Sequence, residues 1–125
     1  MSTPPKHHSP AFLALVNEAR KRIREINIEQ YQEMKTQPHL LVDVREDTEW
    51  SVAHAAGAIH LGKGVIERDV EARVPDKSTT LVLYCGGGFR SALAADALRQ
   101  MGYTNAISLN GGWRAWQNAG LPVEK

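Results

Sequence analysis

The chain has 125 residues, of which 42% are hydrophobic and 23% charged, as in one ordinary globular domain; this excludes a collagen-like or largely disordered protein. Its 15 Lys and Arg nearly balance 14 Asp and Glu, so the net charge of +1 favours neither nucleic acid nor an anionic membrane as a partner. The single cysteine excludes an intramolecular disulfide and a metal site built from several cysteines.

No apolar run approaches the roughly 18 residues that span a bilayer. The apolar stretch at 11–16 is short for the core of a signal peptide, and Glu18 and Arg20 follow it closely. We therefore expect a cytoplasmic protein that does not insert into a membrane.

The N-terminal part of the chain predicts a disordered lead and then a helix. Residues 1–10 contain three prolines and are expected to be poorly ordered. From Phe12 onward, apolar side chains recur at spacings of three and four residues, which predicts an amphipathic helix over residues 11–25. Its basic residues between 20 and 24 have no interleaved aromatic residues and are expected to form a solvated face. This helix covers the chain's own core or forms the contact of a homodimer.

After residue 25, short apolar runs alternate with segments of helical periodicity. Strands are expected at 26–28, 40–44, 58–61, 80–84 and 106–109, and helices at 29–35, 46–52, 65–74, 91–101 and 111–119. Strands that alternate with helices through short connections indicate an α/β domain. We expect a mainly parallel sheet of about five strands with helices on both faces.

Cys85 follows the most apolar of these runs and begins a glycine-rich loop. Three glycines at 86–88 come next, and then Phe89 and Arg90. This position is the carboxyl end of a parallel strand, where ligands of such sheets bind. Glycines let the backbone turn its N–H groups inward, and such amides around a sulfur favour the thiolate. A lone cysteine is more often an inert core residue, but strand, glycines, arginine and helix together favour a nucleophile.

Three segments of the chain resemble the signatures of the rhodanese-like (sulfurtransferase) domain family. Residues 41–59, with Asp43-Val44-Arg45, Glu49-Trp50 and His54, are similar to D-x-R…E-[FYW]-x-x-G-H-I-x-G-A-I, although Ala53 and Ala55 replace the usual Gly and Ile. The second segment is the Cys85 loop with its flanking elements. The third, 109–122, is similar to G-G-x-x-x-W-x-x-x-G-x-P. The resemblance covers about residues 26–123 and leaves the N-terminal helix outside.

The resemblance implies a sulfurtransferase that works by nucleophilic catalysis. Cys85 would take a sulfane sulfur from a small-molecule donor such as thiosulfate or a persulfide. It would hold that sulfur as a persulfide and pass it to cyanide or to a protein or low-molecular-weight thiol. No metal or organic cofactor is implied. The residues expected to bind the transferred sulfur through their amides are Gly86, Gly87, Gly88, Phe89 and Arg90.

Four other residues are expected to support the site. Asp43 and Arg45, at the end of a neighbouring strand, either touch the site or form a structural charge cluster with Glu49. Ser91 is expected to cap the following helix with its hydroxyl oxygen. Trp113 follows a Gly-Gly turn and is expected to line the core or wall the pocket.

His54 and His60 match no standard zinc spacing, so no metal site is expected.

Loop length distinguishes between related activities on this fold. Cys85 to Arg90 is C-x4-R, whereas the related dual-specificity phosphatases have C-x5-R, a loop wide enough for phosphate. The shorter loop favours a sulfur atom. Two alternatives remain: a phosphatase or arsenate reductase with the same Cys loop, and a non-catalytic interaction module. Many thiosulfate-using relatives carry a cationic side chain where this loop has glycine. A protein that carries sulfane sulfur between thiols therefore fits this loop as well as a thiosulfate sulfurtransferase does.

Overall fold

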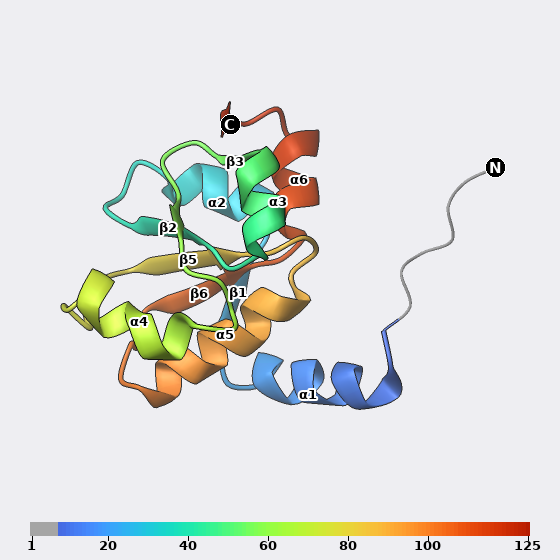
Figure 1. Cartoon of the computed structure of the whole chain (residues 1–125), viewed down its shortest axis with the longest axis vertical. Coiled ribbons are helices and arrows are strands. Elements are labelled where there is room, and N and C mark those ends of the chain that lie inside the picture. Colours follow the sequence, from blue (N-terminus) through green and yellow to red (C-terminus); the bar gives the residue numbers. More distant parts are fainter. Residues whose placement is uncertain (1–7) are drawn as a thin grey trace.

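The computed structural model describes residues 8–125 and contains one five-stranded parallel sheet, in the order β1-β6-β5-β2-β4 (Figure 1). Its strands are β1 (Arg24–Ile26), β2 (Leu40–Asp43), β4 (Ile59–His60), β5 (Leu81–Tyr84) and β6 (Ala106–Leu109). The central strands β5 and β6 are buried along their whole length, as continuous apolar strands of parallel sheets are. The expected α/β architecture is confirmed.

Helices cover both faces of the sheet. They are α1 (Pro10–Arg20), α2 (Ile28–Met34), α3 (Asp47–Val52), α4 (Ile66–Arg73), α5 (Phe89–Gln100) and α6 (Gly112–Asn118). Side chains of α4 and α5 pack with Leu81 and Leu83 on one face, and those of α2 and α6 pack with Val82 and Tyr84 on the other. This alternation follows from the period of two along a strand. Figure 1 shows α1 lying outside α5, as an added layer.

The N-terminal helix is shorter than expected. It begins at Pro10, with the Ser9 hydroxyl accepting a hydrogen bond from the Phe12 amide, and it ends at Arg20. Residues 24–26 form β1 instead, because their backbone pairs in parallel with β6. Tertiary pairing overrides the helical spacing of the apolar residues there. Residues 1–7 of the expected disordered lead lie outside the described residues, and Pro10 belongs to the helix.

Residues 26–28 were expected to form a strand, but only Ile26 belongs to one. Asn27 caps α2 through a reciprocal pair of hydrogen bonds with Gln30, so the helix begins at Ile28. A second sheet was not expected at all. It is a two-stranded antiparallel pair of β3 (His54–Ala55) and β7 (Val123–Glu124), formed where the end of the chain returns beside the segment after α3.

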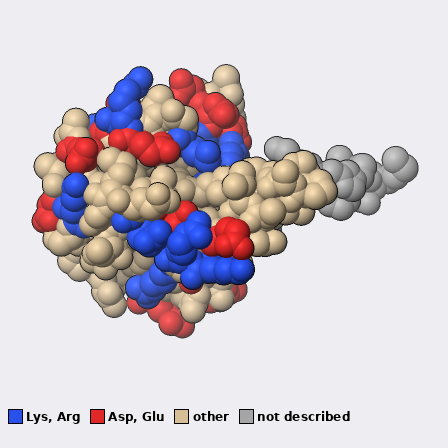
Figure 2. Space-filling model, turned by 90° about the horizontal axis from the view of Figure 1, so that it is seen from below, with Lys and Arg blue, Asp and Glu red and all other residues tan. Residues whose placement is uncertain are grey.

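The first half of α1 projects from the body of the molecule as a segment without charged side chains (Figure 2). Over the rest of this face, Lys and Arg lie beside Asp and Glu. Arg20 pairs with Glu25 at 3.1 Å, and Arg22 pairs with Asp96 at 2.8 Å. The basic run after α1 is therefore largely ion-paired. No helix in residues 8–125 is long and apolar enough to cross a membrane.

Candidate active site

Cys85 lies directly after β5, at the carboxyl edge of the sheet. The residue is only 1% exposed, so its sulfur lies beneath the loop that follows. The amide of Gly88 donates to Cys85 Sγ at 3.1 Å, and the amide of Ser91 donates to it at 3.4 Å. Two backbone donors, one from the loop and one from the first turn of α5, are thus directed at the sulfur. Donors in this position stabilise an anionic sulfur.

Four further amides of the loop are unused. Within residues 8–125, the N–H groups of Gly86, Gly87, Phe89 and Arg90 donate to no acceptor. Two carbonyls of the loop, by contrast, are held: Cys85 O accepts from the Trp113 amide at 2.7 Å, and Gly86 O accepts from the Arg114 amide at 3.2 Å. The loop therefore has four amide donors without an acceptor among the described residues, while two of its carbonyls are bound to α6.

A left-handed residue starts α5 earlier than expected. Gly88 has φ +103°, and a Cβ there would lie 3.2 Å from the amide nitrogen of Gly111. Gly88 is thus the N-cap, and α5 begins at Phe89. The expectation that Ser91 caps this helix is wrong, because Ser91 already lies inside the first turn. Its hydroxyl is turned toward the sulfur instead, 3.7 Å from Cys85 Sγ.

Ser91 also contacts Ser108, a residue that was not singled out from the sequence. The two hydroxyl oxygens are 2.8 Å apart, and both side chains are fully buried. Ser108 lies on β6, beside Leu83 of β5. The signal that could have identified it is a polar residue inside an otherwise apolar strand, Ala106–Leu109.

Arg90, the last residue of the C-x4-R loop, is ion-paired. Its guanidinium nitrogens bind both carboxylate oxygens of Glu49, at 2.8 and 3.3 Å. The hydrogen bond to Glu49 raises the pKa of Arg90, and the hydrogen bond to Arg90 lowers the pKa of Glu49. The Glu49 carboxylate therefore compensates the one side-chain charge of the loop.

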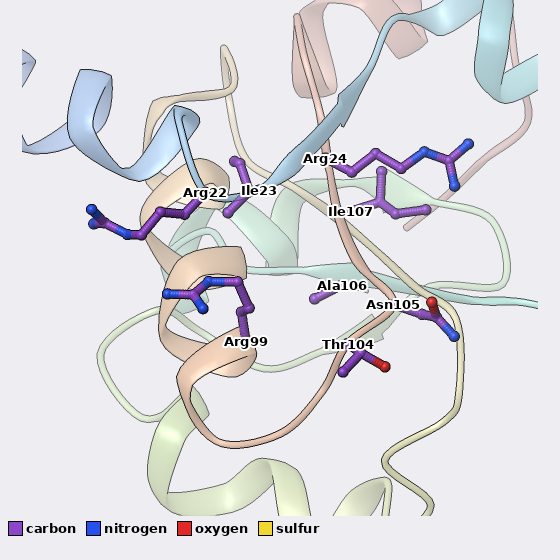
Figure 3. Close-up of a pocket in the computed structure, with 8 residues that line it drawn as sticks. All are labelled: Arg22, Ile23, Arg24, Arg99, Thr104, Asn105, Ala106 and Ile107. Atoms are coloured by element: carbon purple, nitrogen blue, oxygen red, sulfur yellow. The ribbon is translucent and has the colours of Figure 1, made fainter.

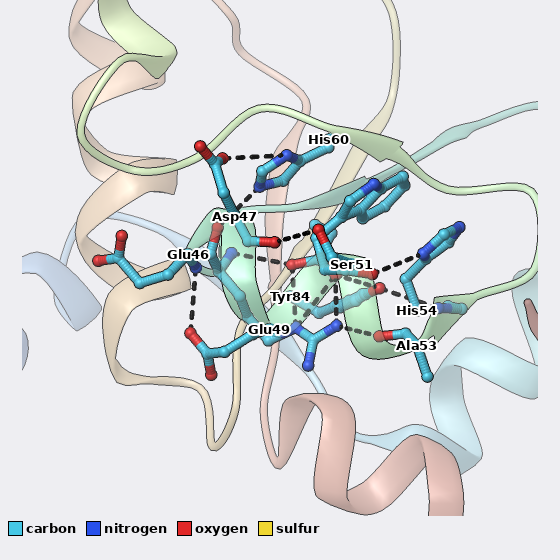
Figure 4. A network of polar contacts seen from close by, with 12 residues as sticks. Glu46, Asp47, Glu49, Ser51, Ala53, His54, His60 and Tyr84 are labelled. Carbon is cyan, nitrogen blue, oxygen red and sulfur yellow. Dashed lines mark hydrogen bonds and ion pairs between the residues drawn. The ribbon is translucent and has the colours of Figure 1, made fainter. Parts of the chain in front are cut away.

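Asp43 and Arg45 form a separate, buried ion pair, with 2.8 Å between Arg45 Nη2 and Asp43 Oδ2. The hydroxyl of Tyr84 donates to Asp43 at 2.7 Å, and Arg45 also donates to the carbonyl of Ala53 at 2.7 Å (Figure 4). Burial tends to lower the pKa of Arg45, but the hydrogen bond to Asp43 and the attraction of nearby negative charges together outweigh burial, so the pKa is raised. Burial also raises the pKa of Tyr84, so its hydroxyl stays protonated and donates. The pair is structural and joins β2 to the segment after α3.

Trp113 links this ion pair to the Cys85 loop. Its ring lies 4.6 Å from the Arg45 guanidinium carbon, and its amide holds the Cys85 carbonyl. The side chain thus packs on the ion pair, while the backbone positions the loop. The contact of Trp113 with the Cys85 loop is therefore made through its main chain.

His54 and His60 stack on the two sides of the Trp50 indole, with ring centroids 3.5 and 4.9 Å away. Each imidazole also bonds to a backbone carbonyl, that of Trp50 for His54 and that of Arg45 for His60. Figure 4 shows both histidines beside α3. In residues 8–125, no three His, Cys, Asp or Glu side chains are grouped so as to hold a metal ion.

Phe89 turns its ring to the N-terminal helix. It lies 6.4 Å from the Phe12 ring and 4.4 Å from the His8 ring, measured between centroids. The Arg20 guanidinium carbon lies 5.1 Å from the Phe89 ring centre. Helix α1 is therefore in direct contact with the residue that opens α5 and carries one of the unused amides.

A small pocket of about 70 Å³ lies at the opposite edge of the sheet, at the amino ends of β1 and β6. It is lined by Arg22, Arg24 and Arg99 among others, but Figure 3 shows the Arg24 guanidinium pointing away from the other two. Arg22 and Arg99 both bind Asp96. The pocket therefore has no converging free charges, and it is remote from Cys85.

A family model described as the rhodanese-like domain matches residues 27–119. Thiosulfate sulfurtransferase GlpE of Haemophilus influenzae is 32% identical over 101 residues, which are 81% of this chain and 94% of GlpE. The probable adenylyltransferase/sulfurtransferase MoeZ of Mycobacterium tuberculosis is 38% identical over 76 residues, 61% of this chain but only 19% of MoeZ.

Among solved structures, a protein of unknown function and possible tyrosine phosphatase from Rhodopseudomonas palustris matches with a TM-score of 0.80 and 26% identity. The match covers 98% of this chain and 100% of that one, and so includes the N-terminal helix. The added layer formed by α1 therefore has a structural counterpart in another protein.

Proposed function

The chain belongs to the rhodanese-like domain family, and from this we propose that it is a sulfurtransferase whose Cys85 carries sulfur as a persulfide. The observation that carries the proposal is the set of amides around Cys85. Two of them, from Gly88 and Ser91, point at Sγ. Those of Gly86, Gly87, Phe89 and Arg90 have no acceptor in residues 8–125 and suit one additional, negatively charged atom.

The proposed reaction has two displacement steps. In the first, the Cys85 thiolate attacks the sulfane sulfur of the donor; a new S–S bond forms and the donor's bond to that sulfur breaks. The donor leaves as sulfite, if it was thiosulfate, or as a thiolate, if it was a persulfide. In the second, an acceptor thiolate or cyanide attacks the terminal sulfur, and Cys85 leaves as thiolate. The unused amides hold the charge of the terminal sulfur between the steps.

The donor class follows from the charges at the loop. Gly86 and Gly87 carry no side-chain cation, and Glu49 compensates the charge of Arg90. A dianion such as thiosulfate therefore meets little net positive charge. Persulfides of proteins or of low-molecular-weight thiols, whose leaving group is a thiolate, fit the loop at least as well.

The direct test is intact-mass spectrometry after incubation with thiosulfate, polysulfide and a low-molecular-weight persulfide. Wild type should gain about 32 Da, one sulfur atom, and lose it on addition of cyanide or a thiol. Cys85→Ser should gain nothing. A Cys85→Ser variant that also carries Ser51→Cys places a thiol on the exposed surface of α3, and should gain far less.

An unmodified wild type with every donor would favour a non-catalytic interaction module. Turnover of an aryl phosphate that is lost in Cys85→Ser would favour a phosphatase instead. We expect no such turnover, because the C-x4-R loop is one residue short of the phosphatase spacing and its arginine is bound to Glu49.

Glu49→Gln should raise the rate with thiosulfate by about fivefold and change the rate with a low-molecular-weight persulfide less. The substitution leaves the Arg90 charge uncompensated beside the loop. The measurement is kcat/KM for both donors, and the gain should shrink as salt is added. Glu46→Gln removes the same charge just before α3 without touching Arg90 and serves as the control. Equal effects of both variants would mean that the charge of Glu49 does not act on the donor through its ion pair with Arg90.

The ion pair of Glu49 and Arg90 makes the stability of the folded protein depend on pH. Because the pKa of Glu49 is lowered in the folded protein, the stability that the pair contributes is present above the ordinary Glu pKa of about 4.3. It is lost as the pH falls through the lowered value. Glu49→Gln should therefore lose its stability difference from wild type at acid pH, as measured by chemical denaturation.

A further inference from the structure

Ser108 takes no part in the two displacement steps, yet it is the only side-chain hydrogen-bond partner of Ser91 besides Cys85 in residues 8–125. We propose that Ser108 is a positioning residue, which holds the Ser91 hydroxyl so that it donates to the Cys85 sulfur and favours the unprotonated form. The chemical purpose of this inference rests on the proposed sulfurtransferase function. The hydrogen-bond arrangement itself does not.

The three groups form a short buried chain. Ser91 Oγ lies 3.7 Å from Cys85 Sγ and 2.8 Å from Ser108 Oγ. Ser91 and Ser108 are both 0% exposed, so bulk water does not reach them. The chain joins α5 to β6 at the point where both adjoin the nucleophile, and in residues 8–125 Ser108 Oγ has no partner other than Ser91.

A count of hydrogens shows which state of the sulfur this chain prefers. The thiol and the two hydroxyls together carry three hydrogens, but only two contacts link them, so one buried hydrogen is left without an acceptor. When the sulfur is a thiolate, two hydrogens remain. Ser108 then donates to Ser91, Ser91 donates to Sγ, and every hydrogen is bonded. An unpaired buried polar hydrogen is costly, so the chain favours the thiolate. The same count would hold for Cys85 and Ser91 alone. Ser108 adds a donor to Ser91 Oγ, which directs the hydrogen of Ser91 at Sγ and strengthens its bond to the anion.

The same arrangement assists the second displacement. When the acceptor attacks the terminal sulfur, the bond between the two sulfurs breaks and its electron pair stays on Cys85 Sγ. The hydroxyl of Ser91 then faces the developing charge, together with the amides of Gly88 and Ser91. Without Ser108, the Ser91 hydroxyl loses the neighbour that donates to its oxygen, and its hydrogen is free to rotate away from the sulfur.

The test is the pH midpoint of thiolate formation at Cys85, read from ultraviolet absorbance as a difference from the Cys85→Ser counterpart of each variant. Ser108→Ala should raise this midpoint by about one pH unit. Ser108→Thr, which keeps the hydroxyl, should return it to within about 0.3 unit of wild type. Ile107→Val, a trimmed neighbour on β6 facing the other side of the sheet, lowers stability but should leave the midpoint unchanged.

A double-variant comparison tests whether Ser108 acts through Ser91. Ser91→Ala alone should raise the midpoint at least as much as Ser108→Ala, and adding Ser108→Ala to it should cause no further rise. If Ser108→Ala folds poorly, Ser108→Val takes its place in this comparison, because it is close in volume to Ser108→Thr but lacks the hydroxyl. An unchanged midpoint in Ser91→Ala, or a full further rise in the double variant, would overturn the proposal.

The readout separates this inference from the proposed function. The thiolate midpoint is measured without donor or acceptor, so a shifted midpoint in a protein that forms no persulfide supports the hydrogen-bond chain and contradicts the sulfurtransferase. Persulfide formation in wild type together with an unshifted midpoint in Ser108→Ala supports the sulfurtransferase and contradicts the role proposed for Ser108.

Discussion

Gly112→Ala should lower the free energy of unfolding by about 4 kcal/mol and abolish most sulfur loading of Cys85. Gly112 has φ +48°, and a Cβ there would overlap the Cys85 carbonyl oxygen and lie 2.9 Å from its carbon. No flexible side-chain end is involved, so backbone must move. The left-handed strain and the overlap act at the same place, where α6 meets the Cys85 loop.

The expected loss of activity follows from the hydrogen bonds at this contact. The Trp113 amide donates to Cys85 O at 2.7 Å, and the Arg114 amide donates to Gly86 O at 3.2 Å. A methyl group between α6 and the loop separates both pairs and turns the loop amides away from the sulfur. Thermal and chemical denaturation measure the stability, and intact-mass spectrometry measures the persulfide.

Gly120→Ala is the matched control for this substitution. Gly120 also has positive φ, +70°, but a Cβ there would have nothing within 4 Å. It should cost only about 1 kcal/mol, the strain of a left-handed alanine, and leave persulfide loading intact. If both variants lose similar stability and loading, the close approach of Gly112 to Cys85 is not the cause.

Asp43→Ala should lower the free energy of unfolding by about 3–5 kcal/mol, because it leaves the Arg45 guanidinium buried without its carboxylate. Asp43 is 0% and Arg45 3% exposed, so water does not replace the lost partner. The Tyr84 hydroxyl and the Arg45 amide also lose their acceptor. Urea denaturation of the variant against wild type measures this loss.

A double-variant cycle identifies the source of this loss. Arg45→Met should also destabilise strongly, but Asp43→Ala combined with Arg45→Met should cost less than the sum, since no unpaired charge remains. Asp69→Ala, which breaks the exposed pair with Arg68, should leave stability near that of wild type. Additive effects of the two buried substitutions would mean that the ion pair itself is not responsible.

Several parts of the fold and site could be predicted because their signals are contiguous in the chain. The apolar run before Cys85 predicted β5, and the glycines and Arg90 after it predicted an amide-lined loop. Two amides do point at Sγ, and four more have no acceptor in residues 8–125. The alternation of elements predicted the parallel sheet for the same reason, since periodicity is a property of neighbouring residues.

The errors occurred where distant segments decide the outcome. Residues 24 and 25 were expected to end the N-terminal helix, but pairing with β6 makes them part of a strand. Ser91 looked like a helix cap, but Gly88 starts the helix earlier and the hydroxyl turns to Ser108, 17 residues further along. The charge of Arg90 is also decided by a distant segment, because Glu49, 41 residues before it, compensates that charge.

The amino-acid sequence by itself determined most of the elements, the place of the glycine-rich loop after Cys85 and the length of that loop, because hydrophobic spacing and glycine content act over a few adjacent residues. Only the tertiary structure decided which charges pair, which hydroxyl faces the sulfur and why Gly112 tolerates no side chain. Those properties depend on which distant segments the sheet brings close to Cys85. The spacing of neighbouring residues in the sequence does not specify such contacts.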